Sequence, residues 1–163
     1  SSAASDVYKR QPFNCTILSC DIRDYPSFYS EYGVLPVSFD ELLERSEEIT
    51  LHLPKTQTTR GLYSRDILDR IRPEAVLINT CRGEIVDEEA LADRLVDELL
   101  RAACFDVFAV EPAENDRLLN LPNFLATPHI GASTEETRVA MAQAALRGLE
   151  ENELVDPEKY YDN

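Results

Sequence analysis

The stretch AVLINTCRGEIVDEEALADRL (residues 75–95) contains, in order, a short apolar run, a polar turn and a segment of helical period. The run AVLIN (75–79) is continuous rather than alternating, which is typical of a strand buried on both faces of a parallel sheet. Asp87 is a candidate N-cap for a helix whose apolar residues share one stripe, namely Leu91, Leu95, Val96 and Leu99. The stretch therefore predicts a strand, a turn and a helix.

The same order of elements repeats on either side of this stretch. Further apolar runs predict strands at 15–20, 49–53, 103–108 and 123–127. Helix starts are predicted by two capping boxes and one further N-cap, namely Ser38 with Glu41, Ser133 with Glu136, and Ser64. The last helix carries one apolar stripe, made of Val139, Ala142, Leu146 and Leu149. This alternation predicts an α/β fold with a Rossmann-type, doubly wound parallel sheet.

Composition limits the function classes. A chain of 163 residues with 44% hydrophobic and 29% charged residues fits one globular domain. Its net charge of -15 would repel a polyanion, so nucleic acid is not an expected partner. No apolar run approaches the roughly 18 residues of a membrane span, and the start lacks the apolar core of a secretory signal. We expect no membrane association and a cytoplasmic protein.

The cysteines give no metal-binding pattern. Cys15, Cys20, Cys81 and Cys104 show no C-x-x-C spacing, and the chain has only two histidines. Three of the cysteines lie in or beside apolar runs, where a free thiol behaves as a small hydrophobe. The expectation is reduced structural cysteines and no bound metal.

The domain organisation follows from these patterns. Residues 1–11 are polar and aperiodic, and we interpret them as a leader outside the fold. Residues 12–154 are expected to form a partial dinucleotide-binding domain with a C-terminal helix, and residues 155–163 an exposed tail. The substrate domain is expected to be absent.

Asp21 follows the strand predicted at 15–20, where an acidic residue can bind the adenosine ribose of a dinucleotide. It favours NAD over NADP, although Arg23 leaves that choice open, and Asp21 could equally be a turn former. A glycine-rich loop should precede it by about 20 residues. The five glycines of the chain form no such loop, so the first strand, phosphate loop and first helix are expected to be missing.

Three motifs resemble the D-isomer-specific 2-hydroxyacid dehydrogenases. They are INTCRGEIVDEEAL (78–91), CFDVFAVEP (104–112) and TPHIGASTEE (127–136), and the segment 38–62 adds to the likeness. The resemblance covers nearly everything from Asn14 to Leu154. It implies an NAD-dependent oxidoreductase whose substrate is a D-2-hydroxy acid, 3-phosphoglycerate first, with hydroxypyruvate or glyoxylate as the close alternative. It also implies that the intact protein is a homodimer or higher homo-oligomer.

The chemistry of three residues fits this activity. A 2-oxo acid needs a cation for its carboxylate, and Arg82 follows a predicted parallel strand; the alternative is a surface ion pair with Glu84. His129 is the candidate for proton transfer, because an unperturbed histidine side chain titrates at about 6.5; the alternative is a loop histidine that bonds its own turn. The resemblance assigns Glu111 to raise the pKa of His129, whereas alone it could be a solvated residue before Pro112.

The resemblance also implies a cofactor site. The residue that matches Asp106 accepts from the nicotinamide carboxamide, and the backbone around Thr80 and Cys81 flanks the same ring. His52, Leu53 and Pro54 line the adenine side. Arg82, His129, Gly131 and Ala132 complete the expected contacts. His52 is expected to be structural, because the resemblance gives it no proton to move.

One local feature of the sequence departs from the family pattern. Glu98 and Ala102 occupy the positions where the family usually ends a helix with glycine, and a left-handed C-cap without glycine costs about 1 kcal/mol.

Two rival interpretations of the function remain. The family also includes nucleotide-sensing corepressors, so a binding protein is one rival, and an inert truncated product is the other. We expect the isolated chain to bind NAD no better than about millimolar, to be inactive and to associate through an exposed sheet edge.

Overall fold

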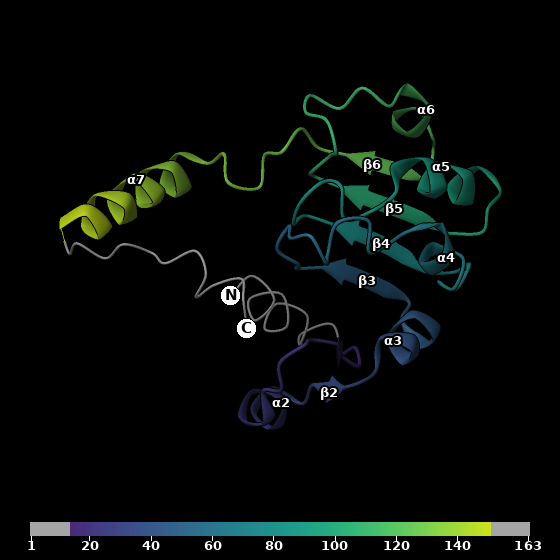
Figure 1. Ribbon diagram of the computed structural model, residues 1–163, viewed down its shortest axis with the longest axis horizontal. Coiled ribbons are helices and arrows are strands. Elements are labelled where there is room, and N and C mark those ends of the chain that lie inside the picture. The colour runs from purple at the N-terminus through teal and green to yellow at the C-terminus, as the bar shows by residue number, and fades with distance from the viewer. Residues whose placement is uncertain (1–13, 151–163) are drawn as a thin grey trace.

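The computed structural model describes residues 14–150, so the predicted leader (1–11) and tail (155–163) lie outside the described residues. Helices and strands alternate along the chain (Figure 1). The elements are β1 (Leu18–Ser19), α2 (Pro26–Tyr32), β2 (Leu35–Pro36), α3 (Phe39–Arg45), β3 (Glu48–Leu51), α4 (Arg65–Leu68), β4 (Val76–Asn79), α5 (Glu88–Val96), β5 (Ala102–Phe105), α6 (Asp116–Leu119), β6 (Phe124–Ala126) and α7 (Glu135–Glu150).

Four strands form one parallel sheet in the order β3-β4-β5-β6. Its register aligns Ile49 with Leu77, Leu77 with Ala103, and Ala103 with Phe124. The arrowheads of these strands point to one edge of the sheet (Figure 1). The predicted parallel α/β sheet is confirmed, and the loops that follow its strands lie along that edge.

Strands β1 and β2 form a separate parallel pair that aligns Leu18 with Leu35. In a Rossmann sheet, whose order is 3-2-1-4-5-6, one strand lies between the positions that β1 and β3 occupy here. No strand of residues 14–150 fills that position. The two sheets therefore match the two sides of a Rossmann sheet, although the sequence predicted only one strand of the smaller side.

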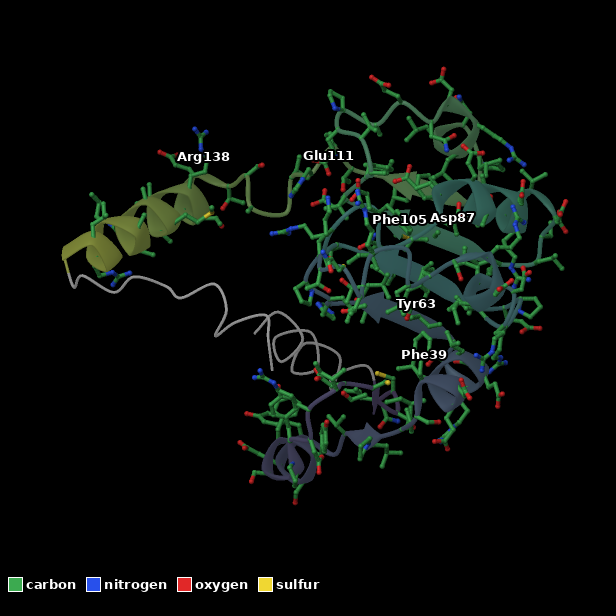
Figure 2. The ribbon with its side chains drawn as sticks, in the orientation of Figure 1. Phe39, Tyr63, Asp87, Phe105, Glu111 and Arg138 are labelled. Atoms are coloured by element: carbon green, nitrogen blue, oxygen red, sulfur yellow. The ribbon has the colours of Figure 1, made fainter. Side chains whose placement is uncertain are left out.

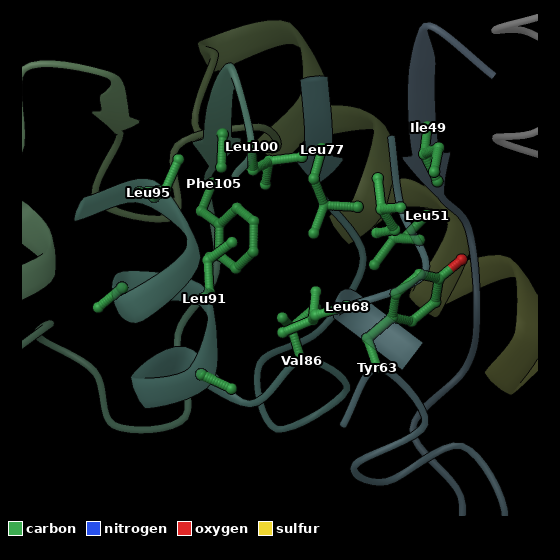
Figure 3. Packing of buried hydrophobic residues seen from close by; sticks show 14 of the residues in the cluster. Ile49, Leu51, Tyr63, Leu68, Leu77, Val86, Leu91, Leu95, Leu100 and Phe105 are labelled. Carbon is green, nitrogen blue, oxygen red and sulfur yellow. The ribbon is translucent and has the colours of Figure 1, made fainter. Parts of the chain in front are cut away.

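The core lies between the four-stranded sheet and its helices. Leu77 and Phe105 of the sheet pack with Leu91 and Leu95 of α5 and Leu68 of α4 (Figure 3). Burial alternates along β3, β4 and β5, so that the residues between the buried ones are only half-buried or exposed. The expectation that these strands are buried on both faces was therefore wrong for the described residues. One face carries the packed core.

The helix starts were predicted with one error. The Ser38 hydroxyl accepts from the Glu41 amide, and the Glu41 carboxylate accepts from the Ser38 amide. Asp87 accepts from two amides of α5. Ser64 is the N-cap of α4. At α7, however, the hydroxyl that accepts the cap hydrogen bond, from the Thr137 amide, belongs to Thr134 and not to Ser133. A helix start one residue later satisfies the same unpaired amides.

Other departures have local causes. The short α2, β2 and α6 were not predicted, and β2 has only two residues, both exposed. Glu98 adopts the left-handed conformation at φ 55°, so the chain keeps the cap geometry without a glycine. Cys15 and Cys20 are exposed, Cys81 and Cys104 are half-buried, and none of the four forms a disulfide among the described residues. Across residues 14–150, the helices are too short or too polar to cross a bilayer.

Candidate active site

The turn after β4 is shaped by a buried asparagine. The Asn79 side chain is 1% exposed; its Nδ2 donates to the Arg82 carbonyl at 3.0 Å, and its Oδ1 accepts from the Cys81 amide at 3.2 Å. Thr80 is exposed at the start of this turn. Arg82 is also exposed, and its Nη1 donates to the Cys81 carbonyl at 2.6 Å. The turn thus presents a guanidinium at the carboxyl edge of the sheet, where a carboxylate can reach it.

Gly83 allows this turn to approach the segment after β5. A methyl group at Gly83 would lie 1.8 Å from the carbonyl oxygen of Phe108. Such a contact is far inside van der Waals distance, so only glycine fits here. The backbone after Arg82 is therefore held against the backbone that leads to Glu111.

Asp106 joins β5 to the loop that contains His129. Its side chain is buried, and its Oδ1 accepts from the Thr127 hydroxyl at 2.5 Å and from the Ile130 amide at 2.9 Å. Its Oδ2 accepts from the Gly131 amide at 2.9 Å. Burial alone would raise the pKa of Asp106, but these hydrogen bonds outweigh it and the pKa lies below its ordinary value. An ionised Asp106 fixes the loop.

His129 and Glu111 are in contact. The His129 Nδ1 lies 2.7 Å from Glu111 Oε2, and Glu111 Oε1 accepts from the Phe108 amide at 3.0 Å. The hydrogen bonds from His129 and from Phe108 lower the pKa of Glu111. Glu111 lies on the side of the sheet from which the chain leaves toward α7 (Figure 2). An ionised carboxylate thus holds one imidazole nitrogen and leaves Nε2 for a substrate.

His129 itself has a left-handed backbone, at φ 52°. This conformation is uncommon for a residue with a side chain and is held here by the anchored neighbours Ile130 and Gly131. The imidazole orientation is therefore set from both its backbone and its carboxylate partner.

The loop after β3 forms another wall of the same edge. Leu53 packs against the core, and the Pro54 carbonyl accepts from the Thr59 hydroxyl at 2.5 Å. His52 is half-buried, and its Nε2 lies 3.2 Å from the Thr50 hydroxyl, which fits the structural role expected for it. Glu84 binds Lys55 and Arg60 of this loop, so the alternative pairing of Arg82 with Glu84 is not the one observed.

Two predicted cofactor contacts lie apart from this network. Asp21 follows β1 and accepts from the Arg23 amide at 2.9 Å, as a turn former does. Ala132 is exposed in the segment before α7. The structure brings together Asp106, Glu111, His129 and Gly131, and it places Arg82 in the adjoining turn.

Sequence reasoning missed several residues that shape the site. Asn79 ends a buried strand, and a buried amide at that place could have indicated a turn-forming role. Thr127 was assigned only to a strand end, and Gly83 only to a motif. For Glu84 the sequence carries no signal, because its partners Lys55 and Arg60 are 24 or more residues away along the chain.

Comparison with known proteins identifies the family. The model of the D-isomer specific 2-hydroxyacid dehydrogenase, NAD binding domain, matches residues 3–131. The chain belongs to this family. The predicted family, fold and cofactor class are thereby confirmed, and residues 3–131 match the NAD-binding domain of the family.

Individual relatives carry more than one enzyme name. The chain is 40% identical over 126 residues to D-3-phosphoglycerate dehydrogenase of Mycobacterium leprae, covering 77% of this chain and 24% of the relative. It is 41% identical over 137 residues to glyoxylate/hydroxypyruvate reductase B of Enterobacter agglomerans, covering 79% and 42%. A solved glyoxylate reductase from Paecilomyes thermophila has a TM-score of 0.84 at 31% identity, covering 93% and 48%. The chain thus spans under half of each relative.

The described residues fit a nicotinamide cofactor at Asp106. Each carboxylate oxygen can accept two hydrogen bonds, and Asp106 Oδ2 accepts only that of Gly131 among residues 14–150. It retains capacity for a carboxamide donor. Over the same residues, His, Cys, Asp and Glu side chains form no group of three or more that could hold a metal ion.

Proposed function

We propose that this chain supplies the dinucleotide-binding half of an enzyme that interconverts a D-2-hydroxy acid and its 2-oxo acid. The observation that carries the proposal is the 2.7 Å contact between His129 Nδ1 and Glu111 Oε2, fixed beside the anchored Asp106 loop. NAD supplies the hydride acceptor of such a reaction when bound. The chain must supply the proton transfer and hold the acid.

His129 handles the proton in this proposal. Oxidation of the hydroxy acid removes the proton of its hydroxyl, and the Nε2 of a neutral imidazole can accept it while Nδ1–H donates to Glu111. Glu111 stays ionised because its pKa is lowered, so it balances the imidazolium that forms. In the reverse direction the imidazolium returns the proton to the oxo oxygen.

Arg82 binds the substrate carboxylate in this proposal. A guanidinium offers paired donors that match a carboxylate, and the Asn79 turn fixes the backbone that carries it. The cofactor side would be formed by Leu53, Pro54, Thr80 and Cys81, together with Asp106, Gly131 and Ala132, with Asp21 on the ribose. Among the substrates, 3-phosphoglycerate is proposed first, and hydroxypyruvate or glyoxylate is favoured by the equally similar reductases.

A substrate panel tests this proposal on the full gene product. NADH oxidation is measured with 3-phosphohydroxypyruvate, hydroxypyruvate and glyoxylate, and again in Arg82→Ala. We expect one of these oxo acids to be reduced, and Arg82→Ala to raise KM and depress kcat together, since the contact both binds and orients. NADH binding without reduction of any oxo acid would favour a nucleotide-sensing protein. An unchanged kcat/KM in Arg82→Ala would remove Arg82 from the site.

A further inference from the structure

Glu84 has an unusual backbone for its residue type. It lies at φ 60°, in the left-handed region that glycine adopts without strain. It is two residues after Arg82 and directly follows Gly83. A residue held in this region commonly has its conformation determined by its surroundings, and such residues gather at functional sites. The contacts around Glu84 are therefore expected to hold its backbone in this conformation.

The Glu84 side chain reaches the loop after β3, which we call the 54–61 loop. Its Oε2 lies 2.6 Å from Lys55 Nζ, and its Oε1 accepts from Arg60 Nη2 at 2.9 Å. The Glu84 carbonyl accepts from the Gly61 amide at 2.7 Å. One residue thus holds both ends of the loop, by side chain and by backbone.

Hydrogen bonds within the 54–61 loop connect its two ends. The Thr59 hydroxyl donates to the Pro54 carbonyl, the Thr56 amide donates to the Thr59 hydroxyl at 2.9 Å, and the Arg60 amide donates to the Thr56 carbonyl at 3.1 Å. A displacement of Lys55 and Arg60 is therefore transmitted to Pro54. Pro54 is a residue of the proposed dinucleotide wall.

We propose that Glu84 is a positioning residue that sets the distance between the 54–61 loop and the Arg82 turn, and so the width of the dinucleotide site. This inference rests on the proposed function, because the width matters only if a dinucleotide binds there. The Glu84 side chain is 25% exposed, so its two ion pairs are partly shielded from water. The two cations also lower the pKa of Glu84 to about 2, so it is ionised throughout the working pH range.

The chain offers a matched control in Asp93. Asp93 also binds two cations, Arg65 and Arg117, and its side chain is 34% exposed. Its partners lie on α4 and α6, away from the proposed dinucleotide wall. Asp93→Asn therefore loses a comparable ion-pair cluster without touching the 54–61 loop.

Limited trypsin digestion of the full chain tests the clamp directly. Trypsin cleaves after Lys55 and Arg60, and we expect Glu84→Gln and Glu84→Gly to speed both cleavages by about fivefold or more, as a loss of about 1 kcal/mol in loop closure implies. Cleavage after the buried Arg94 reports global opening and should not accelerate equally. Asp93→Asn should leave cleavage after Lys55 and Arg60 unchanged. Unchanged cleavage in the two Glu84 variants would overturn the proposal.

NADH affinity and melting temperature then separate positioning from stability. Glycine relieves the backbone strain at this position, so Glu84→Gly should melt above Glu84→Gln. Both variants of the full gene product should nevertheless bind NADH about fivefold more weakly than the parent, and Asp93→Asn should bind it normally. Affinity that follows melting temperature, or that stays unchanged, would overturn the positioning role. A parent that binds no NADH would end the proposed function and the positioning role with it; the cleavage rates would then decide only whether Glu84 holds the loop.

Discussion

The four-stranded body and the β1–β2 pair are both parallel sheets, yet they are packed very differently. In the body, residues 39–126, Leu77, Leu91 and Ala103 are completely buried. In the β1–β2 pair, Leu35 is 46% exposed and the nearby Ile22 is 91% exposed. Parallel pairing alone thus gives little stability, because burial of side chains between layers is the dominant favourable contribution to folding. Most candidate site residues lie on the body or in the loop that leaves it, which keeps them on the stable region.

The largest expected difference between the two regions comes from leucine truncation. Leu77→Ala removes a fully buried side chain and should cost about 2–5 kcal/mol of unfolding free energy. Leu35→Ala on β2 should cost less than about 1 kcal/mol, because nearly half of that side chain is already in water. Urea unfolding of both variants measures this. Equal costs would show that the β1–β2 pair is folded as firmly as the body.

Two glycines give the next contrast. Gly83→Ala places a methyl 1.8 Å from the Phe108 carbonyl oxygen and should destabilise the body by about 3 kcal/mol. Gly148→Ala, in the peripheral helix α7, meets no described atom within 4 Å and should stabilise that helix by about 0.5–1 kcal/mol. Thermal unfolding and helical circular dichroism report the two effects. A harmless Gly83→Ala would mean that the Arg82 turn and the Phe108 segment are not in close approach.

Acid should weaken the body through its ion-paired carboxylates. Arg60 and Lys55 lower the pKa of Glu84 to about 2 from its ordinary value of 4.5, and Arg65 and Arg117 lower the pKa of Asp93. Groups with depressed pKa values contribute stability above their unfolded pKa and lose it as pH falls through the folded one. The urea midpoint should therefore be flat from pH 7 to about 5 and fall from about 4.5 toward 2. Glu84→Gln should reduce the fall of the urea midpoint at low pH. A pH dependence of the midpoint identical to that of the parent would contradict the ion pairs assigned to Glu84.

The smallest expected effects compare two helix ends. Glu98 ends α5 of the body at φ 55°, and Gly33 ends α2 of the peripheral segment at φ 64°. Glu98→Gly should stabilise the protein by about 1 kcal/mol, and Gly33→Ala should destabilise it by about 1 kcal/mol if α2 is folded as firmly as the body. Denaturant unfolding of both variants measures the pair. A change in unfolding free energy near zero for Gly33→Ala would show that α2 is folded less firmly than the body.

The sequence predicted the body better than the periphery, for physical reasons. β4, β5 and β6 lie in continuous apolar runs, and β3 carries Ile49 and Leu51, because each strand contributes to one packed core; these apolar residues are visible in the sequence. β2 has only two residues, both exposed and one of them a proline, so it leaves no such pattern. The contact of His129 with Glu111 could be predicted from family motifs. Thr127 and Glu84 could not, because their roles depend on a hydrogen bond and on ion pairs between segments that only the folded chain brings together.

The pH dependence of kcat/KM for NADH-dependent reduction of the oxo acid tests the central claim most directly, in the full gene product, in Glu111→Gln and in His129→Ala. Loss of the carboxylate that lies 2.7 Å from Nδ1 removes the partner of the protonated imidazole, so the alkaline limb of Glu111→Gln should begin at lower pH. His129→Ala should lower kcat/KM by about 10²–10⁴-fold at every pH. A Glu111→Gln profile that overlays that of the parent would contradict the assignment of these two side chains as one acid–base unit.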